Sequence, residues 1–524
     1  MQREKFVQDI ASGFEFKGES IILGGGIFEG EVITNSLVKI PLKTLNRHGL
    51  IAGATGTGKT KTLQIIAEQL SRNGVPSLLM DIKGDLSGIA AAATPNPKLD
   101  ERHAKIGIEF VRDSSPVEFL SLSDEPGVRL RATVSEFGPV LFSKILGLND
   151  TQSGIVSLVF KYCDDHNLPL LDLADMKKTL QWITGDGKAE ITREYGTIST
   201  ASVGTISRKI IELEQQGAEI FFGETSFDVN DLVRFDRNGK GMVSILRVTD
   251  IQDKPKLFST FMLQLLAEIY AKFPEQGDAD KPKLCLFIDE AHLVFNEASK
   301  VLLDQIESVI KLIRSKGVGI FFITQSPVDI PQSVLGQLGF KVQHALRAFT
   351  AKDRQSIKLA AQNFPDSPYY KVDQLLTQMG IGEALIMSLN EKGIPTPLVH
   401  TYLRAPQSRM DVLTPQEINE IIQNSHLISR YNKVVERESA YEILQRKMDA
   451  AQEQKEEQEI QKQAPKAPAR TSSRQEKSTI ETIVNSTTAR QIGRTVATSL
   501  VRGLMGVFLG GSKSKGTKKS GLFW

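Results

Sequence analysis

The stretch Gly53-Ala54-Thr55-Gly56-Thr57-Gly58-Lys59-Thr60 fits the pattern G-x-x-x-x-G-K-[ST] at every position. Before it, residues 50–52 (Leu-Ile-Ala) are typical of the end of a short buried strand. After it, apolar residues recur with the spacing of a helix that buries one face: Leu63, Ile66, Ala67 and Leu70. In this context the glycines let backbone N–H groups turn toward a phosphate, and the helix N-terminus adds a partial positive charge. The sequence therefore predicts a binding site for a nucleoside triphosphate.

We assign nucleotide binding to the whole loop and to the residue that follows it: Gly53, Ala54, Thr55, Gly56, Thr57, Gly58, Lys59, Thr60 and Lys61. Lys59 can bridge the β- and γ-phosphates, and the Thr60 hydroxyl can bind Mg²⁺. ATP and Mg²⁺ are therefore the expected cofactors. The alternative is a glycine-rich turn that only mimics the motif.

The bulk composition excludes several classes of protein. With 524 residues, 40% apolar and 24% charged, the chain is expected to form more than one globular domain. A net charge of +2 excludes a generally cationic nucleic-acid binder, so any contact with a polyanion needs a local patch. The two cysteines, Cys163 and Cys285, are too far apart in sequence to suggest a disulfide framework or a zinc site. No signal peptide or long apolar run is evident, so we expect a cytoplasmic protein.

The order of patterns along the chain predicts an α/β fold with a mostly parallel sheet. Residues 1–45 form a short β-rich segment, with a turn expected at Gly24-Gly25-Gly26, that adds strands to the edge of the core or to a neighbouring subunit. Residues 46–404 alternate strands and helices, interrupted by a helical insertion at about 139–225.

Beyond residue 404 the composition changes. A helical extension is expected over 405–462, with Tyr441, Leu444, Met448 and Ala451 on one helical spacing, and a disordered linker over 463–478. Residues 479–524 suggest an amphipathic helix with a Lys-rich tail. Such a tail can lie on an anionic membrane surface or pack against a neighbouring subunit.

A second motif supplies acidic groups. The apolar run Leu284–Ile288 is typical of a strand buried on both faces, and Asp289 and Glu290 follow it directly. Asp289 is suited to hold Mg²⁺ with Thr60, and Glu290 to act as the general base that activates water. This pairing predicts hydrolysis rather than transfer of the phosphoryl group. The alternative is a buried strand that ends in an ordinary turn.

Further polar residues follow two more predicted strands. Gln325 follows the run 320–324. If this run is an additional strand between the phosphate loop and the acidic motif, Gln325 is a candidate sensor of the γ-phosphate; the alternative is a glutamine that only ends the strand. Arg347 lies in an alternating strand predicted over 340–348 and Arg354 follows it, and each is a candidate arginine finger for the site of an adjacent subunit. For either arginine the alternative is a surface salt bridge, and His344 is interpreted as a hydrogen-bonded strand histidine.

Several strings together resemble the HerA–FtsK superfamily of ring-forming ATPases, and within it the bacterial HerA-like family of the YjgR type. They lie over essentially the whole chain: Asn46–Leu50, Asp81–Leu86, Phe287–Leu293, Thr324–Pro327 with Ile330-Pro331, His344–Thr350, Ser408–Met410 and Ile492–Gly506. The first 45 residues are shorter than the β-barrel domain of HerA itself.

The resemblance implies a RecA-like core, a homo-oligomer that is a hexameric ring with nucleotide at its subunit interfaces, and movement on double-stranded DNA. Two other functions stay open: a motor that acts on protein or at a membrane surface through the C-terminal tail, and an ATP-dependent switch that moves nothing.

Overall fold

The computed structural model describes residues 2–250, 254–295, 300–433, 435 and 437–463. The chain divides into two compact units, with the boundary between Tyr441 and Glu442. The predicted linker beyond residue 463 and the predicted amphipathic tail lie outside the described residues.

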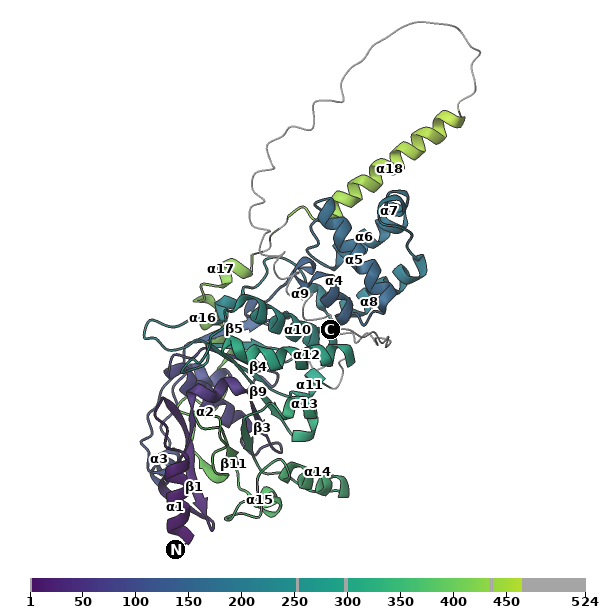
Figure 1. Ribbon diagram of the computed structural model, residues 1–524. Helices are drawn as coiled ribbons and strands as arrows, with labels where there is room; N and C mark the ends of the chain where they lie inside the picture. The colour runs from purple at the N-terminus through teal and green to yellow at the C-terminus, as the bar shows by residue number, and fades with distance from the viewer. Residues whose placement is uncertain (1, 251–253, 296–299, 434, 436, 464–524) are drawn as a thin grey trace, which may run out of the picture. The chain divides into compact units, whose positions relative to one another are not determined.

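Twelve strands of the described residues form one sheet, in the order β2-β1-β12-β11-β10-β3-β9-β8-β4-β7-β5-β6 (Figure 1). Their bounds are β1 Ser20–Phe28, β2 Glu31–Pro41, β3 Gly49–Ala52, β4 Ser77–Asp81, β5 Val117–Ser121, β6 Val128–Arg129, β7 Val243–Arg247, β8 Leu284–Ile288, β9 Val318–Thr324, β10 Phe340–Gln343, β11 Glu383–Met387 and β12 Val399–Leu403. From β10 to β6 every neighbouring pair is parallel, whereas β2, β1, β12 and β11 pair antiparallel up to β10. The predicted α/β class with a mostly parallel sheet is therefore confirmed.

The central strands are apolar on both faces because helices cover both. On one face the rings of Phe287 and Phe321 stack with their centroids 4.8 Å apart. They belong to the same core cluster as Leu63 and Ile66 of α2 (Lys59–Arg72). On the other face Phe322 meets Phe295, at 5.6 Å between ring centroids. Burial on both sides explains why these strands are continuous hydrophobic runs.

The helix after the phosphate loop is as predicted. Leu63, Ile66, Ala67 and Leu70 are each at most 1% exposed. The other helices of the described residues are α1 Gln2–Gly13, α3 Pro97–Ile106, α4 Val134–Ile145, α5 Asp150–Asp165, α6 Leu173–Thr184, α7 Lys188–Glu194, α8 Thr200–Glu214, α9 Ala218–Phe221, α10 Pro255–Lys272, α11 His292–Phe295, α12 Lys300–Ile313, α13 Gln332–Leu335, α14 Ala351–Ala361, α15 Val372–Gln378, α16 Pro415–Gln423, α17 Ile428–Tyr431 and α18 Ala440–Gln463.

The N-terminal residues join the core sheet as a hairpin, since β1 pairs with both β2 and β12. The turn predicted at Gly24-Gly25-Gly26 is wrong, because these glycines lie inside β1 and the chain reverses at Glu29-Gly30. The glycines serve close approach instead: a Cβ at Gly24 would come within 2.0 Å of the Tyr402 carbonyl oxygen. A glycine in a strand often marks such a contact.

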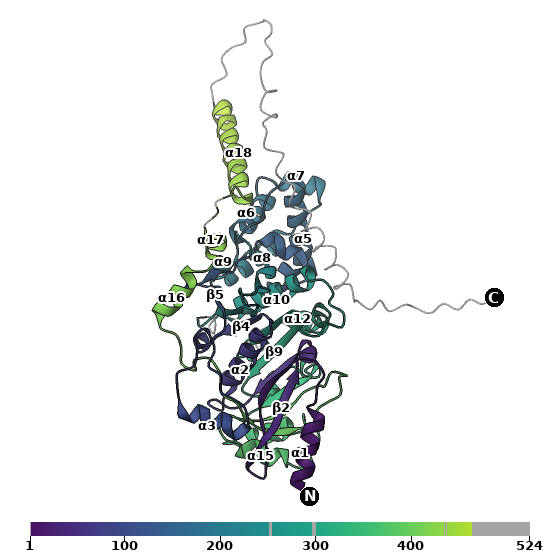
Figure 2. The same cartoon turned by 90° about the vertical axis from the view of Figure 1, so that its left-hand side faces the viewer.

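The predicted helical insertion comprises α4 to α9, between β6 and β7, and Figures 1 and 2 show these helices gathered away from the β1–β2 hairpin. The insertion begins earlier than predicted. Thr133 caps the start of α4 through a reciprocal pair of hydrogen bonds with Glu136. Pro139 therefore does not lie in the first turn of the helix but follows a kink at Gly138.

Part of the predicted C-terminal extension belongs to the first compact unit. The Asn432 side chain accepts the Arg129 N–H at 2.9 Å and donates to the Gly127 carbonyl at 2.8 Å, which fixes the segment after α17 to β6. The predicted helical spacing from Tyr441 falls within α18. None of the described helices is both long and apolar enough to cross a lipid bilayer.

Candidate functional site

The loop Gly53–Thr60 connects β3 to α2 and is tied to the carboxyl ends of the strands beside it. The Gly53 N–H donates to the Thr324 carbonyl at 3.3 Å, and the Ala54 N–H donates to the Ala345 carbonyl at 2.8 Å. At the crest of the loop Thr55 and Gly56 are exposed. The base of the loop is thus fixed by β9 and the end of β10, while its crest is open to a ligand.

The His344 side chain packs directly against this loop. Its Nδ1 lies 3.0 Å from the Glu383 carbonyl oxygen and its Nε2 lies 2.9 Å from the Thr62 hydroxyl. Burial lowers the pKa of His344 to about 4, so the ring is neutral. Gly53, at φ +155°, must be glycine here, because a Cβ would lie 2.4 Å from the Cβ of His344. His344 is hydrogen-bonded as predicted, but it lies just past the end of β10, because the strand predicted over 340–348 ends at Gln343.

Lys59 is folded back onto its own loop. Its Nζ donates to the Gly53 carbonyl at 2.6 Å and to the Ala54 carbonyl at 3.1 Å. Burial and the neighbouring Lys83 lower the pKa of Lys59, against the opposing charges of Glu290 and Asp289. The loop lysine and the acidic pair therefore lie within electrostatic range of each other.

The acidic pair lies at the carboxyl end of β8 and is buried, with Asp289 3% and Glu290 6% exposed. Burial raises the pKa of Asp289 to about 6, and the charge of Glu290 adds to the rise while Lys83 opposes it. Glu290 has φ +44°, a left-handed backbone that costs a non-glycine residue about 1 kcal/mol or more. Its Oε2 has no hydrogen-bond partner within the described residues, although His292 Nδ1 is 3.3 Å away. A buried carboxylate oxygen without a donor is available for a ligand.

Lys83 is the residue of this site that sequence reasoning missed. Its Nζ lies 2.6 Å from Glu290 Oε1 and 3.8 Å from Asp289 Oδ2. The signal was present, because Lys83 follows β4, and polar residues after parallel strands meet at one edge of the sheet. What the sequence did not show is that β4 lies directly beside β8.

Gln325 follows β9, and β9 lies between β3 and β8 in the sheet. This is the extra strand between the phosphate loop and the acidic motif that the assignment of a sensor assumed. The Gln325 side chain is exposed, while the turn after it is fixed by Asp329, whose carboxylate accepts the Thr324 hydroxyl at 2.5 Å and the Ser326 N–H at 3.1 Å. Gln325 thus lies at the strand end that borders both motifs.

Arg347 and Arg354, the two candidate arginine fingers, lie in the segment that follows β10. Arg347 and Arg354 are exposed, and Arg347 Nη1 makes a long 3.4 Å hydrogen bond to the Thr377 carbonyl. Between them Phe349 is 87% exposed. No ion pair is found for either arginine among the described residues, so the salt-bridge alternative has no support there.

The Lys61 side chain is directed to the segment after β12 rather than to the crest of the loop. Its Nζ donates to the Met410 carbonyl at 2.5 Å. The same segment is held to α2 by Glu68, whose carboxylate accepts the backbone N–H groups of Gln407 and Ser408 at 2.8–3.1 Å. The Lys61 side chain is thus engaged away from the crest of the loop.

A mainly apolar cavity of about 210 Å³ opens beside the loop between α2 and this segment. It is lined by Gly58, Lys61, Thr62, Ile65, Leu99, Arg102, Ile381, Gly382, Leu403, Arg404, Ala405, Pro406 and Met410. Arg102 is fixed at its edge, where the guanidinium donates to the carbonyls of Leu403 at 2.6 Å and Gly382 at 2.7 Å.

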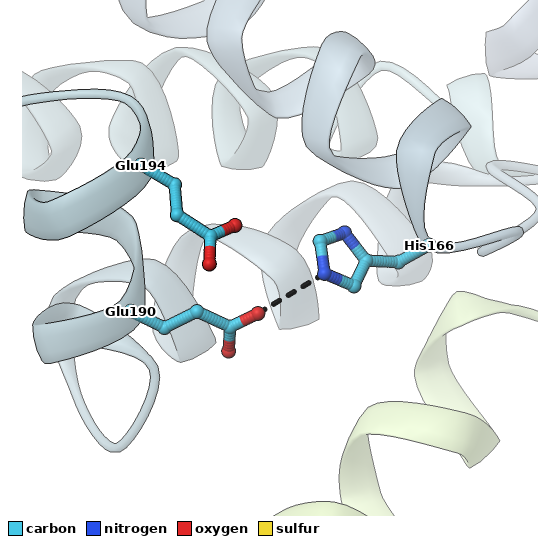
Figure 3. Close-up of side chains that lie close together, drawn as sticks. All are labelled: His166, Glu190 and Glu194. Atoms are coloured by element: carbon cyan, nitrogen blue, oxygen red, sulfur yellow. Dashed lines mark ion pairs between the residues drawn. The ribbon is translucent and has the colours of Figure 1, made fainter.

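A separate cluster lies in the helical insertion. His166, Glu190 and Glu194 turn their side chains toward one another (Figure 3), and each offers a ligand atom within 4.8 Å of the others. His166 Nε2 lies 3.0 Å from Glu190 Oε1, while its Nδ1 lies 3.0 Å from the Tyr162 carbonyl oxygen. An ion pair of a partly exposed histidine accounts for this geometry.

Comparisons with known proteins agree with the fold and the motifs. Residues 29–515 match the family model "Helicase HerA-like C-terminal". The DNA double-strand break repair helicase HerA of Sulfolobus acidocaldarius is 21% identical over 381 residues, which cover 72% of this chain and 69% of that protein. The protein of the same name from Sulfurisphaera tokodaii is 20% identical over 379 residues, 70% of this chain and 68% of its own.

Among solved structures, the unbound monoclinic form of the bacterial conjugative coupling protein TrwBdeltaN70 is similar in fold, with a TM-score of 0.50 and 14% identity. The match covers 78% of this chain and 95% of TrwBdeltaN70. Because the family model spans nearly the whole chain and the phosphate loop and acidic pair meet at one edge of the sheet, the chain belongs to the helicase HerA-like C-terminal family and is a P-loop ATPase of the HerA–FtsK type.

Proposed function

We propose that the protein hydrolyses ATP at the loop Gly53–Thr60 and uses the energy to move along double-stranded DNA as a subunit of a homo-oligomeric ring. The observation that carries this proposal is the convergence of three strand ends. The phosphate loop after β3, Gln325 after β9 and the acidic pair after β8 occupy consecutive positions at the carboxyl edge of the sheet. In open α/β sheets ligands bind at this edge.

The residues present fit a magnesium–nucleotide complex. Thr60 and Asp289 offer hard oxygen ligands, and the charge of Mg²⁺ would stabilise the buried Asp289 carboxylate. The Lys59 ammonium now donates to two loop carbonyls, and phosphate oxygens can replace these carbonyls as its acceptors. When bound, the metal neutralises charge that develops on the phosphates.

Glu290 is the proposed general base. Its buried Oε2 lacks a hydrogen-bond donor in the described part of the chain, so it can accept the proton of an attacking water. Gln325, exposed at the neighbouring strand end, is the proposed sensor of the γ-phosphate. Together these two residues favour hydrolysis over phosphoryl transfer to a second substrate.

The cavity between α2 and the segment 403–410 is the proposed site of the nucleoside. It begins at Gly58 and Lys61, where a nucleotide anchored by its phosphates continues toward its sugar and base. Apolar walls such as Leu99 and Ile381 suit the faces of a purine ring.

A ring completes the site in this proposal. Arg347 and Arg354 are exposed cations without an ion-pair partner in the described residues, and Phe349 between them offers apolar surface for a neighbouring copy. One of the two is proposed to reach the γ-phosphate bound by the adjacent subunit, and a hexamer is the stoichiometry that the HerA–FtsK resemblance implies.

Duplex DNA is the proposed track because the two HerA relatives bear the name of a DNA repair helicase. A net charge of +2 does not oppose it, since a few cations per subunit add up around a ring. A cytoplasmic location is part of the same proposal, in keeping with two buried cysteines that are both free.

The test is the ATP hydrolysis rate of protein of known oligomeric state, measured at low salt without nucleic acid and with duplex DNA, single-stranded DNA or RNA. Duplex DNA is expected to raise the rate several-fold, and the stimulation should fall as salt rises. A rate that is indifferent to duplex DNA at every salt concentration would contradict the DNA part of the proposal.

A further inference from the structure

Lys83 is held beside the acidic pair by a dedicated turn. The Asp81 carboxylate, only 2% exposed, accepts the backbone N–H groups of Gly84, Asp85 and Leu86 at 2.8, 3.1 and 3.1 Å. Gly84 takes the left-handed backbone that this turn requires, at φ +72°. The backbone that carries Lys83 after β4 is therefore fixed by this turn.

The ammonium of Lys83 occupies the position of a counter-ion to both carboxylates. It lies 2.6 Å from Glu290 Oε1 and 3.8 Å from Asp289 Oδ2, and 36% of its side chain is exposed. Burial opposes its charge, yet Asp289 and Glu290 together raise the pKa of Lys83. Lys59 lies within electrostatic range of the same two acids, and His292 Nδ1 is 3.3 Å from Glu290 Oε2, but the ammonium of Lys83 makes the shortest contact of the three basic groups.

The same contact occupies one of the two carboxylate oxygens of the proposed base. The short hydrogen bond from the ammonium sets the position of the Glu290 carboxylate, which is then not placed by an attacking water molecule. A magnesium–nucleotide complex brings its own positive charge to Asp289 and so competes with Lys83 for the acidic pair.

We propose that Lys83 is a positioning residue that latches Glu290 in the resting site, and that binding of the magnesium–nucleotide complex displaces its ammonium and frees the base. This inference rests on the proposed role of Glu290 but not on any role for DNA.

The test compares Lys83→Met, which removes the charge at similar length, with Lys83→Arg, which retains it. Lys188→Met is the matched control, because Lys188 is an exposed lysine on α7 of the helical insertion. Because Lys83 is partly exposed, the Met variant is expected to fold, which thermal unfolding checks. The first readout is the Mg²⁺ concentration that half-saturates binding of a fluorescent, non-hydrolysable ATP analogue.

Lys83→Met should lower that Mg²⁺ concentration at least ~3-fold, because the competing charge is gone. The second readout is hydrolysis without DNA at a Mg²⁺ concentration below half-saturation, which should rise at least ~2-fold in Lys83→Met, whereas Lys83→Arg and Lys188→Met resemble the wild type. An unchanged Mg²⁺ requirement would overturn the proposal, and so would loss of hydrolysis in Lys83→Met that Lys83→Arg restores. Failure of DNA stimulation would bear on the proposed function alone.

Discussion

At the scale of single residues, substitutions of Lys59 and Glu290 separate the binding of ATP from its hydrolysis. Lys59→Ala removes the ammonium that now bonds two loop carbonyls and is expected to weaken ATP binding at least ~10-fold. Glu290→Gln keeps the size of the side chain and is expected to leave binding within about 3-fold while the hydrolysis rate falls at least ~100-fold. Equilibrium binding of labelled ATP and steady-state phosphate release measure the two effects. Normal hydrolysis by Glu290→Gln would show that another group is the base.

His344 provides a pH-dependent stability term with a definite sign. Its folded pKa of about 4 lies below the ordinary histidine value of 6.5, so the unfolded chain binds the proton more readily between those pH values. The contribution is present above pH 6.5 and is lost as the pH falls toward 4. Between pH 7 and pH 5 it amounts to about 1–2 kcal/mol of the free energy of unfolding.

His344→Gln should therefore lose less stability than the wild type when the pH drops from 7 to 5, as measured by the midpoint of urea unfolding at each pH. Glu68 and Asp81, whose pKa values burial raises to about 7, act in the opposite direction. Both proteins contain these acids, so the difference between the two proteins isolates the histidine. Equal pH slopes would contradict a neutral buried ring at this position.

At the scale of elements, the attachment of the segment after β12 to α2 depends on one buried carboxylate. Glu68 accepts the N–H groups of Gln407 and Ser408 and the Ser408 hydroxyl at 2.8 Å. Glu68→Ala leaves these buried donors without an acceptor and is expected to lower the free energy of unfolding by about 2–3 kcal/mol. It should also weaken ATP binding, because the segment lines the proposed nucleoside cavity.

Glu420→Ala is the control for this prediction, since Glu420 is an exposed glutamate on α16. Urea unfolding and ATP binding are measured for both variants. If Glu68→Ala matched Glu420→Ala in both assays, the hydrogen bonds from Gln407 and Ser408 to Glu68 would contribute neither to stability nor to ATP binding.

Elements also show how far the sequence could predict the structure. The α2 face and the buried strand β8 follow from local periodicity, so both were predictable. The run Gly24–Gly26 is part of a strand and not the predicted turn, because all three residues pair with β12, a strand far away in sequence, and Gly24 packs directly against the Tyr402 backbone. Lys83 was missed for the same reason, since only the strand order places β4 beside β8. Local chemistry could be predicted, whereas the choice of strand neighbours could not.

At the scale of the whole molecule, a ring with shared sites predicts complementation between two inactive variants. If Arg347 acts on the adjacent subunit, each site needs Glu290 from one subunit and Arg347 from its neighbour. An Arg347→Ala subunit still supplies Glu290, and a neighbouring Glu290→Gln subunit still supplies Arg347, so the site between them is complete. In a random equal mixture roughly a quarter of the sites are complete, so about that fraction of the wild-type hydrolysis rate should return.

The same mixture with Arg354→Ala distinguishes the two candidate fingers. Only the arginine that reaches across the interface should restore hydrolysis when mixed with Glu290→Gln, and phosphate release over a range of mixing ratios measures it. If neither mixture recovers activity although each arginine variant alone is inactive, the arginines act within their own subunit.

The central claim is that hydrolysis at the loop Gly53–Thr60 drives movement on duplex DNA, and displacement of a triplex-forming strand from a linear duplex tests it most directly. The account predicts that the wild-type protein displaces the third strand in the presence of ATP and Mg²⁺, after a delay that grows with the length of duplex between loading site and triplex. Glu290→Gln should bind the same DNA and displace nothing. A wild-type protein that hydrolyses ATP in the presence of the duplex but never displaces the third strand would contradict the account.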